Sequence, residues 1–301
     1  MHLVTYQYRG EIGLGVVRGD QMVQLERATL DGRFNGSGAM IDLIAGGRAR
    51  LDAVRLIAAV AGPQVLIPLA KVRLLAPVPR PPKNVICVGM NYLEHAIESA
   101  RARGQEYAPL AHPAFFTKAI SAVTGPYDDI AYPAPLSEQM DWEVELAVVI
   151  GARGRDWTPE QVPAHIFGYT VVNDVSARDV QYYHGGQFFK GKSLDGFCPM
   201  GPWIVTADEV PDPQALRLTT RVNGVVKQDG TTHDMIFDIP HLLAELSQGM
   251  TLEPGDVIAT GTPSGVGNGR TPKEFLRPGD VVEVTVDGIG ALRNRVVMRG
   301  A

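Results

Sequence analysis

The sequence has few of the features that mark secreted, membrane-spanning or nucleic-acid-binding proteins. Only two cysteines occur among 301 residues, Cys87 and Cys198, and they lack the paired spacing of a zinc site or a redox motif. The formal net charge is −5, and no dense lysine and arginine run offers a field for a phosphate backbone. No segment approaches the roughly 18 uninterrupted apolar residues of a membrane helix, and residues 1–10 do not resemble a signal peptide. We therefore expect a cytoplasmic protein with no disulfide framework, no nucleic-acid partner and no membrane partner.

The composition predicts a globular fold that is mostly β with some α. Hydrophobic residues make up 45% of the chain and charged residues 20%, which is enough apolar material for one large core with a small satellite domain. The 33 glycines and 22 prolines favour many short strands joined by tight turns over long helices. Cys87 lies within an apolar run, and we expect it to be a buried small hydrophobe.

The first 75 residues form a small α+β unit in this interpretation. Apolar patterns predict strands at 3–8, 13–18 and 21–25 and helices at 40–45 and 51–60. Prolines at positions 77, 79, 81 and 82 then stiffen the chain and remove amide donors, as suits a linker between packed units. We therefore predict a small N-terminal domain, residues 1–75, and a larger domain, residues 76–301, that holds every motif with recognisable chemistry.

The larger domain alternates short strands with a few helices. Strands are expected at 84–89, 142–150, 168–172, 257–259 and 281–286, the last two each following a Pro-Gly-Asp turn. Asn91 and Glu94 have the spacing of a capping box that opens a helix through Arg103. Further helices are expected at 175–182 and at 240–247, the latter ended by Gly249.

Glu143 and Glu145 stand two residues apart in the apolar segment 142–150. Side chains alternate faces along a strand, so both carboxylates project from one side. The segment is apolar on both faces, which predicts a buried strand, where two adjacent anions are costly unless a cation neutralises them. The pair is therefore a candidate metal site; the alternative is an exposed sheet face with two solvated glutamates.

Asp174 supplies a third carboxylate at the end of the apolar strand 169–172. We expect it to open a helix and to share one helical face with Arg178 and Gln181. Three carboxylates make an oxygen-only shell, which suits a hard cation such as Mg²⁺ and disfavours zinc and copper. The alternative is that Asp174 is a helix cap and Arg178 a surface charge.

Two glycine-rich segments offer groups for an anionic ligand. Residues 185–193 are basic and bring Lys192 forward, although their spacing does not fit a nucleotide-binding loop. Residues 260–267 follow a strand and could direct backbone amides and the Thr262 hydroxyl at a carboxylate. A plain surface loop is the equal alternative for each segment.

His95 and Glu98 lie three residues apart on the helix expected after Asn91. The carboxylate could orient the imidazole as a general base toward water. A solvent-exposed pair on a helix is the alternative.

These motifs occur in an order that resembles the fumarylacetoacetate hydrolase family. The resemblance rests on Asn91-Tyr92, His95 and Glu98, the run DWEVE at 141–145, NDVSARD at 173–179 with Gln181, GKS at 191–193 with Asp195, and TGTPSGVG at 260–267. It covers roughly residues 80–300 and indicates a bacterial member similar to acylpyruvate hydrolases or 2-hydroxyhepta-2,4-diene-1,7-dioate isomerases. It implies a mixed β-sandwich roll, with a smaller N-terminal domain before it, that forms a homodimer.

The resemblance also implies the roles of individual residues. Glu143, Glu145 and Asp174 would bind one Mg²⁺ or Mn²⁺ per subunit. A small anionic 2-oxo acid would be the substrate.

The remaining roles concern the substrate. Lys192 and Gln181 would contact substrate oxygens, Arg178 would support the substrate site, and Thr262 would bind a substrate carboxylate. His95 and Glu98 would sit on a lid helix that orders over the substrate.

We expect from this a hydrolase that cleaves the C–C bond of an acylpyruvate, with pyruvate leaving as an enolate. His95, assisted by Glu98, would activate water, and Lys192 would stabilise the developing oxyanion. The alternatives are oxaloacetate decarboxylation, isomerisation of hydroxymuconate-type diacids and hydration of 2-oxo-4-enoates. The pocket beyond the metal decides between them, and we expect its walls in the loops at 107–116 and 182–189. A protein that binds a 2-oxo acid without turning it over is the alternative from another class, although it would need no base above the acidic residues.

Overall fold

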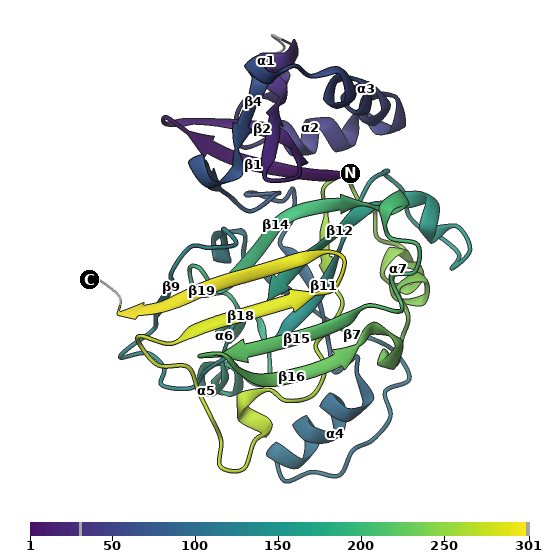
Figure 1. Ribbon diagram of the computed structural model, residues 1–301. Helices are drawn as coiled ribbons and strands as arrows, with labels where there is room; N and C mark the ends of the chain where they lie inside the picture. Colours follow the sequence, from purple (N-terminus) through teal and green to yellow (C-terminus); the bar gives the residue numbers. More distant parts are fainter. Residues whose placement is uncertain (30–31, 299–301) are drawn as a thin grey trace.

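The computed structural model describes residues 1–29 and 32–298. Strands dominate, and they form two large sheets that pack face to face, with a small α+β unit at one end (Figure 1). The expectation of a strand-rich mixed fold is therefore confirmed. Within the described residues, none of the helices combines the length and the apolar character that crossing a bilayer requires.

The N-terminal unit is a small sheet covered by helices. Its strands are β1 (His2–Tyr8), β2 (Glu11–Arg18), β3 (Gln21–Gln24), β4 (Leu66–Pro68) and β5 (Arg73–Leu74), and its helices are α1 (Leu25–Thr29), α2 (Ala39–Ala45) and α3 (Gly47–Val60). The strands and helices expected in this region are confirmed, with ends that differ by a few residues. β1 also pairs with β14, placing His2 opposite Val205, so the unit continues the main sheet.

The main sheet has twelve strands and holds the centre of the molecule. Its order is β4-β3-β2-β1-β14-β12-β11-β17-β6-β7, with β5 beside β1 and β8 beside β14. Its other members are β6 (Val85–Gly89), β7 (Ala114–Lys118), β8 (Val123–Thr124), β11 (Val144–Ile150), β12 (Ile166–Asn173), β14 (Cys198–Thr206) and β17 (Val257–Ala259). Most pairs are antiparallel, whereas β17 runs parallel to β6 and β14 parallel to β8.

A five-stranded sheet lies against one face of the main sheet. Its order is β16 (Val225–Thr231), β15 (Arg217–Val222), β18 (Val281–Val286), β19 (Gly290–Met298) and β9 (Ile130–Tyr132). A separate pair consists of β10 (Met140–Asp141) and β13 (Ser176–Ala177). The remaining α-helices are α4 (Leu93–Ala102), α5 (Arg178–Tyr183), α6 (Phe189–Lys192) and α7 (Ile239–Ser247). Short 3₁₀ turns lie at Gly32–Phe34, Pro63–Val65, Leu69–Lys71, Ile120–Ala122, Val162–His165, Ala207–Glu209, Thr232–Asp234 and Gly267–Gly269.

Strand β11 is buried on both faces, as its sequence, apolar apart from Glu145, predicts. Leu146 and Val148 pack toward the five-stranded sheet, whereas Ala147 and Val149 join the core formed with the N-terminal helices. A strand between two cores is fixed in position, because a one-residue slip would exchange its two faces. The start of β11 is therefore a rigid place from which to present a functional side chain.

The capping box expected at Asn91 is not formed. Helix α4 begins at Leu93 after Tyr92, and no side chain caps it. Instead, the side-chain nitrogen Nδ2 of Asn91 donates to the carbonyl oxygens of Phe237 and Thr260, and its side-chain oxygen Oδ1 accepts from the backbone amide of Phe237. Local spacing suggested a cap, but contacts about 150 residues away compete successfully for the same side chain.

Candidate metal centre and active site

Glu143, Glu145 and Asp174 converge at one end of the central strands. Each offers a carboxylate oxygen that lies within 4.8 Å of the others, and all three side chains are buried. The pairing of β11 with β12 places Val144 opposite Asn173, and the Asp174 amide donates to the Glu143 carbonyl at 2.8 Å. The start of one strand and the end of its antiparallel neighbour thus meet, which brings residues 30 positions apart in the sequence together.

The local structure around Asp174 differs from the sequence prediction. Residues 176–177 form strand β13, which pairs with β10, so helix α5 begins only at Arg178. The prediction that Asp174 shares a helical face with Arg178 and Gln181 is therefore wrong. Asp174 reaches the other carboxylates because it directly follows β12, and the pairing of β13 holds the chain extended after it.

Buried cations surround two of the three carboxylates. The Lys192 ammonium donates to Glu143 Oε2 at 2.7 Å and to Asp174 Oδ2 at 2.8 Å, and Arg178 Nη2 donates to Glu143 Oε1 at 2.7 Å. Lys118 donates to the other oxygen of Asp174. Burial alone would raise the pKa of Glu143, but Lys192 and Arg178 outweigh it and lower that pKa.

Glu145 is the exception within this cluster. Its only hydrogen-bond donor within the described residues is the Gly261 amide, at 2.8 Å, and no cation contacts it. Burial, with the charges of Asp174 and Glu143, raises the pKa of Glu145 well above its ordinary value. Within the described residues, the cluster therefore holds one carboxylate that no cation contacts.

This arrangement fits a bound divalent cation. The donor set contains only carboxylate oxygens, which Mg²⁺ and Mn²⁺ prefer, and a positive ion among them would hold Glu145 ionised. The buried trio would then share one cation, with room for ligand oxygens in its remaining positions. A divalent metal is thus the cofactor for which this site is built, as the sequence predicted.

Asp141 ties the cluster to a neighbouring loop. Its carboxylate accepts from Arg178 Nε at 2.8 Å and from the backbone amides of Trp142, Gly267 and Asn268 at 2.7–3.0 Å. Sequence reasoning assigned it no role, although it opens the DWEVE run. Arg178, expected beside the substrate, gives three of its nitrogens to Asp141, Glu143 and Gln181, so it holds the site together from within.

Helix α4 covers the cluster and carries the histidine pair. His95 Nδ1 lies 3.3 Å from Glu98 Oε2, and His95 Nε2 lies 3.4 Å from Ser99 Oγ. Glu98 also accepts from the Gly265 amide at 3.1 and 3.2 Å, which attaches the helix to the loop after β17. His95 is buried and lines the pocket, and the Glu98 side chain is only 15% exposed, so the alternative of a solvent-exposed helix pair does not apply.

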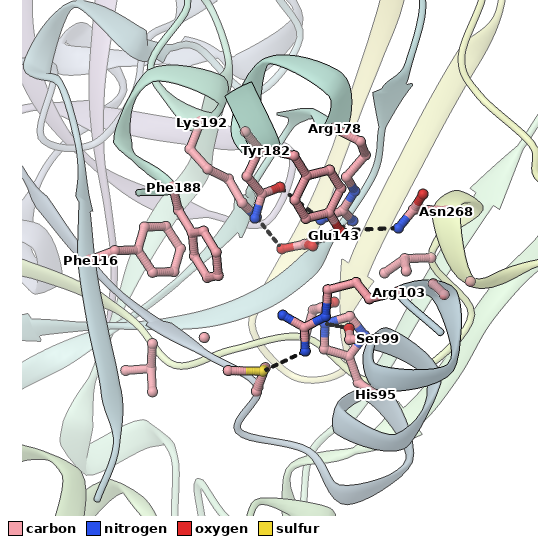
Figure 2. Close-up of a pocket in the computed structure, with 18 of the residues that line it drawn as sticks. His95, Ser99, Arg103, Phe116, Glu143, Arg178, Tyr182, Phe188, Lys192 and Asn268 are labelled. Atoms are coloured by element: carbon pink, nitrogen blue, oxygen red, sulfur yellow. Dashed lines mark hydrogen bonds and ion pairs between the residues drawn. The ribbon is translucent and has the colours of Figure 1, made fainter. Parts of the chain in front are cut away.

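The predicted residues surround one small pocket of about 40 Å³. Its lining includes His95, Glu143, Glu145, Arg178, Gln181, Lys192 and Thr262. Figure 2 shows His95, Ser99 and Arg103 on one side of this space and Lys192, Tyr182 and Arg178 on the other. Asp174 lies behind Lys192, and Glu98 lies behind His95.

Thr262 is placed at the pocket but already has a partner. Its hydroxyl accepts from the Gln228 side-chain amide at 2.8 Å, which leaves its own proton to donate to a ligand.

Lys118, behind the pocket, and Arg103, in its lining, were not anticipated from the sequence. Lys118 ends strand β7, and its side chain is fully buried. A lysine at the end of a largely apolar strand is the sequence signal that could have found it, because a buried lysine needs a carboxylate partner. Arg103 lines the pocket, but its segment carries no pattern that separates it from neighbouring residues. Phe116 and Phe188 also line the pocket, within the two segments that were expected as its walls.

Most of the chain matches a known protein family. The profile described as "Fumarylacetoacetate (FAA) hydrolase C-terminal" matches residues 84–297. The chain is 51% identical over 228 residues to "Oxaloacetate tautomerase YisK" of Bacillus subtilis, covering 76% of this chain and 74% of that protein.

Two solved structures are similar over nearly the whole chain. "Fumarylacetoacetate hydrolase (EaFAH)" from Exiguobacterium antarcticum is 42% identical with a TM-score of 0.83, covering 99% of this chain and 100% of that one. Maleylpyruvate hydrolase from Sphingobium sp. SYK-6, in complex with manganese (II) ion and pyruvate, is 34% identical with a TM-score of 0.78, covering 99% of each chain.

Proposed function

Because the chain belongs to the fumarylacetoacetate hydrolase family, whose members include metal-dependent enzymes, we propose that it interconverts the keto and enol forms of oxaloacetate. The observation that carries this proposal is the pocket of about 40 Å³ in which His95 faces the acidic trio. The 51% identity to a protein named as an oxaloacetate tautomerase supports the same choice.

Glu143, Glu145 and Asp174 would hold Mg²⁺ or Mn²⁺. When bound, such a cation supplies a Lewis acid beside the 2-oxo group of the substrate. Asp141 and Arg178 keep the trio in place, since their contacts join its carboxylates to the loop at 267–268.

His95 is the residue that would move the proton. Its imidazole takes a proton from C3 of oxaloacetate. The C3–H electron pair becomes the C2=C3 bond, and the C2=O π pair moves onto O2. The imidazolium then returns the proton to O2. Glu98 orients the ring through Nδ1 and is itself fixed by the Gly265 amide. No net proton is gained or lost, as a tautomerisation requires.

Lys192 would stabilise the negative charge that develops on O2. Burial opposes a charged lysine, but Asp174 and Glu143 outweigh that effect and raise its pKa, so it stays an ammonium and acts as a donor. Gln181 and Thr262, both at the pocket, would donate to the carboxylate next to the 2-oxo group.

Arg103 could receive the second carboxylate of oxaloacetate. It lines the pocket, and its guanidinium contacts only Met90 Sδ, at 3.8 Å, with no acid paired to it among residues 1–29 and 32–298. An unpaired cation at the pocket mouth favours a dianionic substrate over a monoanionic one.

A C–C hydrolase acting on acylpyruvates is the second candidate. The His95 and Glu98 pair could orient a water molecule as readily as it could remove a C3 proton. The similar maleylpyruvate hydrolase, solved with manganese and pyruvate, favours this activity.

The test compares both reactions under the same conditions. Decay of enol oxaloacetate, followed by its ultraviolet absorbance, should be accelerated with Mn²⁺ or Mg²⁺ and not with a chelator. His95→Ala should lower this rate about 100-fold or more while Mn²⁺ binding is kept. His241→Ala is the matched control, since His241 forms a similar pair with Asp238 on an exposed surface. Faster hydrolysis of acetylpyruvate than tautomerisation would favour the second candidate, and no metal-dependent reaction with either compound would refute both.

A further inference from the structure

Two aromatic rings close one side of the pocket. The rings of Phe116, from β7, and Phe188, just before α6, have centroids 5.4 Å apart and meet edge to face at 74°. Figure 2 shows the two rings side by side next to Lys192, away from Tyr182 and Asn268. We call this pair, Phe116 and Phe188, the aromatic wall.

The aromatic wall is held in place from behind. A Cβ atom at Gly89 would lie 3.3 Å from Phe188 Cε2, so the ring rests directly against the end of β6 and cannot swing further back. The Phe116 ring lies under the Lys192 ammonium, with 5.4 Å between the nitrogen and the ring centroid. The position of the wall is therefore coupled to the residue that we place beside O2.

The chain segment just before Phe188 is exposed to solvent. The segment that leads into Phe188, residues 184–187, is exposed, and a Cβ atom added at Gly185 or Gly186 would meet no other atom within 4 Å. The Phe188 ring itself is only partly buried. Removing that ring would therefore join the pocket to an exposed surface without displacing any other packed element.

From this geometry we propose that Phe188, seated against Phe116 and Gly89, is the residue that limits substrate length. The Arg103 guanidinium contacts Met90, the neighbour of the Gly89 on which the Phe188 ring rests. A four-carbon 2-oxo acid would end at Arg103, whereas a longer chain would extend past it into the position of the Phe188 ring. The inference rests on the proposed function for its substrate class, but it concerns ligand length and not the reaction. Phe188 is thus a specificity-determining residue, and no step of the proton transfer depends on it.

Ligand binding to the Mn²⁺-loaded protein tests this inference without requiring turnover. Isothermal titration should give a Kd for oxaloacetate at least about tenfold lower than for the six-carbon analogue 2-oxoadipate in the unmodified protein. In Phe188→Ala, the ratio of the Kd for 2-oxoadipate to the Kd for oxaloacetate should fall about tenfold. Phe189→Ala is the matched control, since Phe189 is 44% exposed, does not line the pocket and should leave both Kd values unchanged.

Phe188→Leu serves as a second variant if the alanine variant does not fold, and it should lower the same ratio by a smaller factor. An unchanged ratio of the two Kd values in a folded variant would overturn the inference, as would equal binding of both ligands by the unmodified protein. If the ratio shifts as expected but no tautomerisation is observed, the length limit stands and the proposed reaction falls. If the unmodified protein binds neither ligand, both fall.

Discussion

Replacing Asp141 by asparagine should destabilise the folded protein strongly. The carboxylate is fully buried, and it accepts from Arg178 and from three backbone amides. Asparagine would remove the negative charge and turn its side-chain NH2 group toward other donors, which leaves the buried Arg178 guanidinium without one of its two carboxylate partners. Breaking a buried, hydrogen-bonded ion pair costs about 3–5 kcal/mol.

Urea unfolding measures this cost directly. With an m-value of about 3 kcal/mol per M, which suits a chain of this size, the expected loss lowers the urea midpoint by roughly 1–1.7 M. Mn²⁺ binding should persist, because Glu143, Glu145 and Asp174 are unchanged.

An exposed pair of the same chemistry supplies the control. Arg217 contacts both carboxylate oxygens of Asp229 at 2.7 Å, but both side chains are about half exposed. Asp229→Asn should therefore cost less than about 1 kcal/mol. Equal midpoint shifts for Asp141→Asn and Asp229→Asn would refute the argument that burial makes the Asp141 contacts important.

Two further predictions concern the lid and the N-terminal unit. Glu98→Ala should slow the metal-dependent reaction about 10–100-fold, because His95 loses the partner that orients it, while Mn²⁺ affinity measured by titration stays the same; a parallel loss of Mn²⁺ binding would contradict this. Burial raises the pKa of Glu26 above 4.5, so the folded state favours its protonated form. The stabilisation that protonated Glu26 gives to the folded protein is complete below the pKa of Glu26 in the unfolded chain. It is lost as the pH rises through the higher pKa of Glu26 in the folded protein. Glu26→Gln should therefore flatten this part of the curve of melting temperature against pH, and an unchanged curve would show that Glu26 does not contribute.

Local sequence patterns predicted the strands well and the helix boundaries less well. The strands at 257–259 and 281–286 end where they were expected, because β-branched runs after Pro-Gly-Asp turns have few other conformations available. The helix around Arg178 starts late because residues 176–177 pair with β10, a partner about 35 residues away that no local pattern reveals.

The same distinction holds for the site. Glu143 and Glu145 were identified because two acids interrupt an apolar strand, and Asp174 was identified because it follows another. Lys118 was missed because its importance comes only from its tertiary contact with Asp174. Phe188 lies in a segment that was expected as a pocket wall, but its contact with Phe116 could not be foreseen. The domain boundary near residue 75 and the homodimer remain predictions.

Titration of the purified protein with Mn²⁺, followed by the electron paramagnetic resonance signal of the free ion, tests the central claim most directly. The unmodified protein should bind a single Mn²⁺ per chain, and Glu145→Gln should abolish that binding because it removes the carboxylate that no cation contacts within the described residues. Glu283→Gln, at an exposed ion pair with Arg293, should bind Mn²⁺ like the unmodified protein. Saturable binding that is equally tight in Glu145→Gln, or no binding by the unmodified protein, would contradict the metal centre described above.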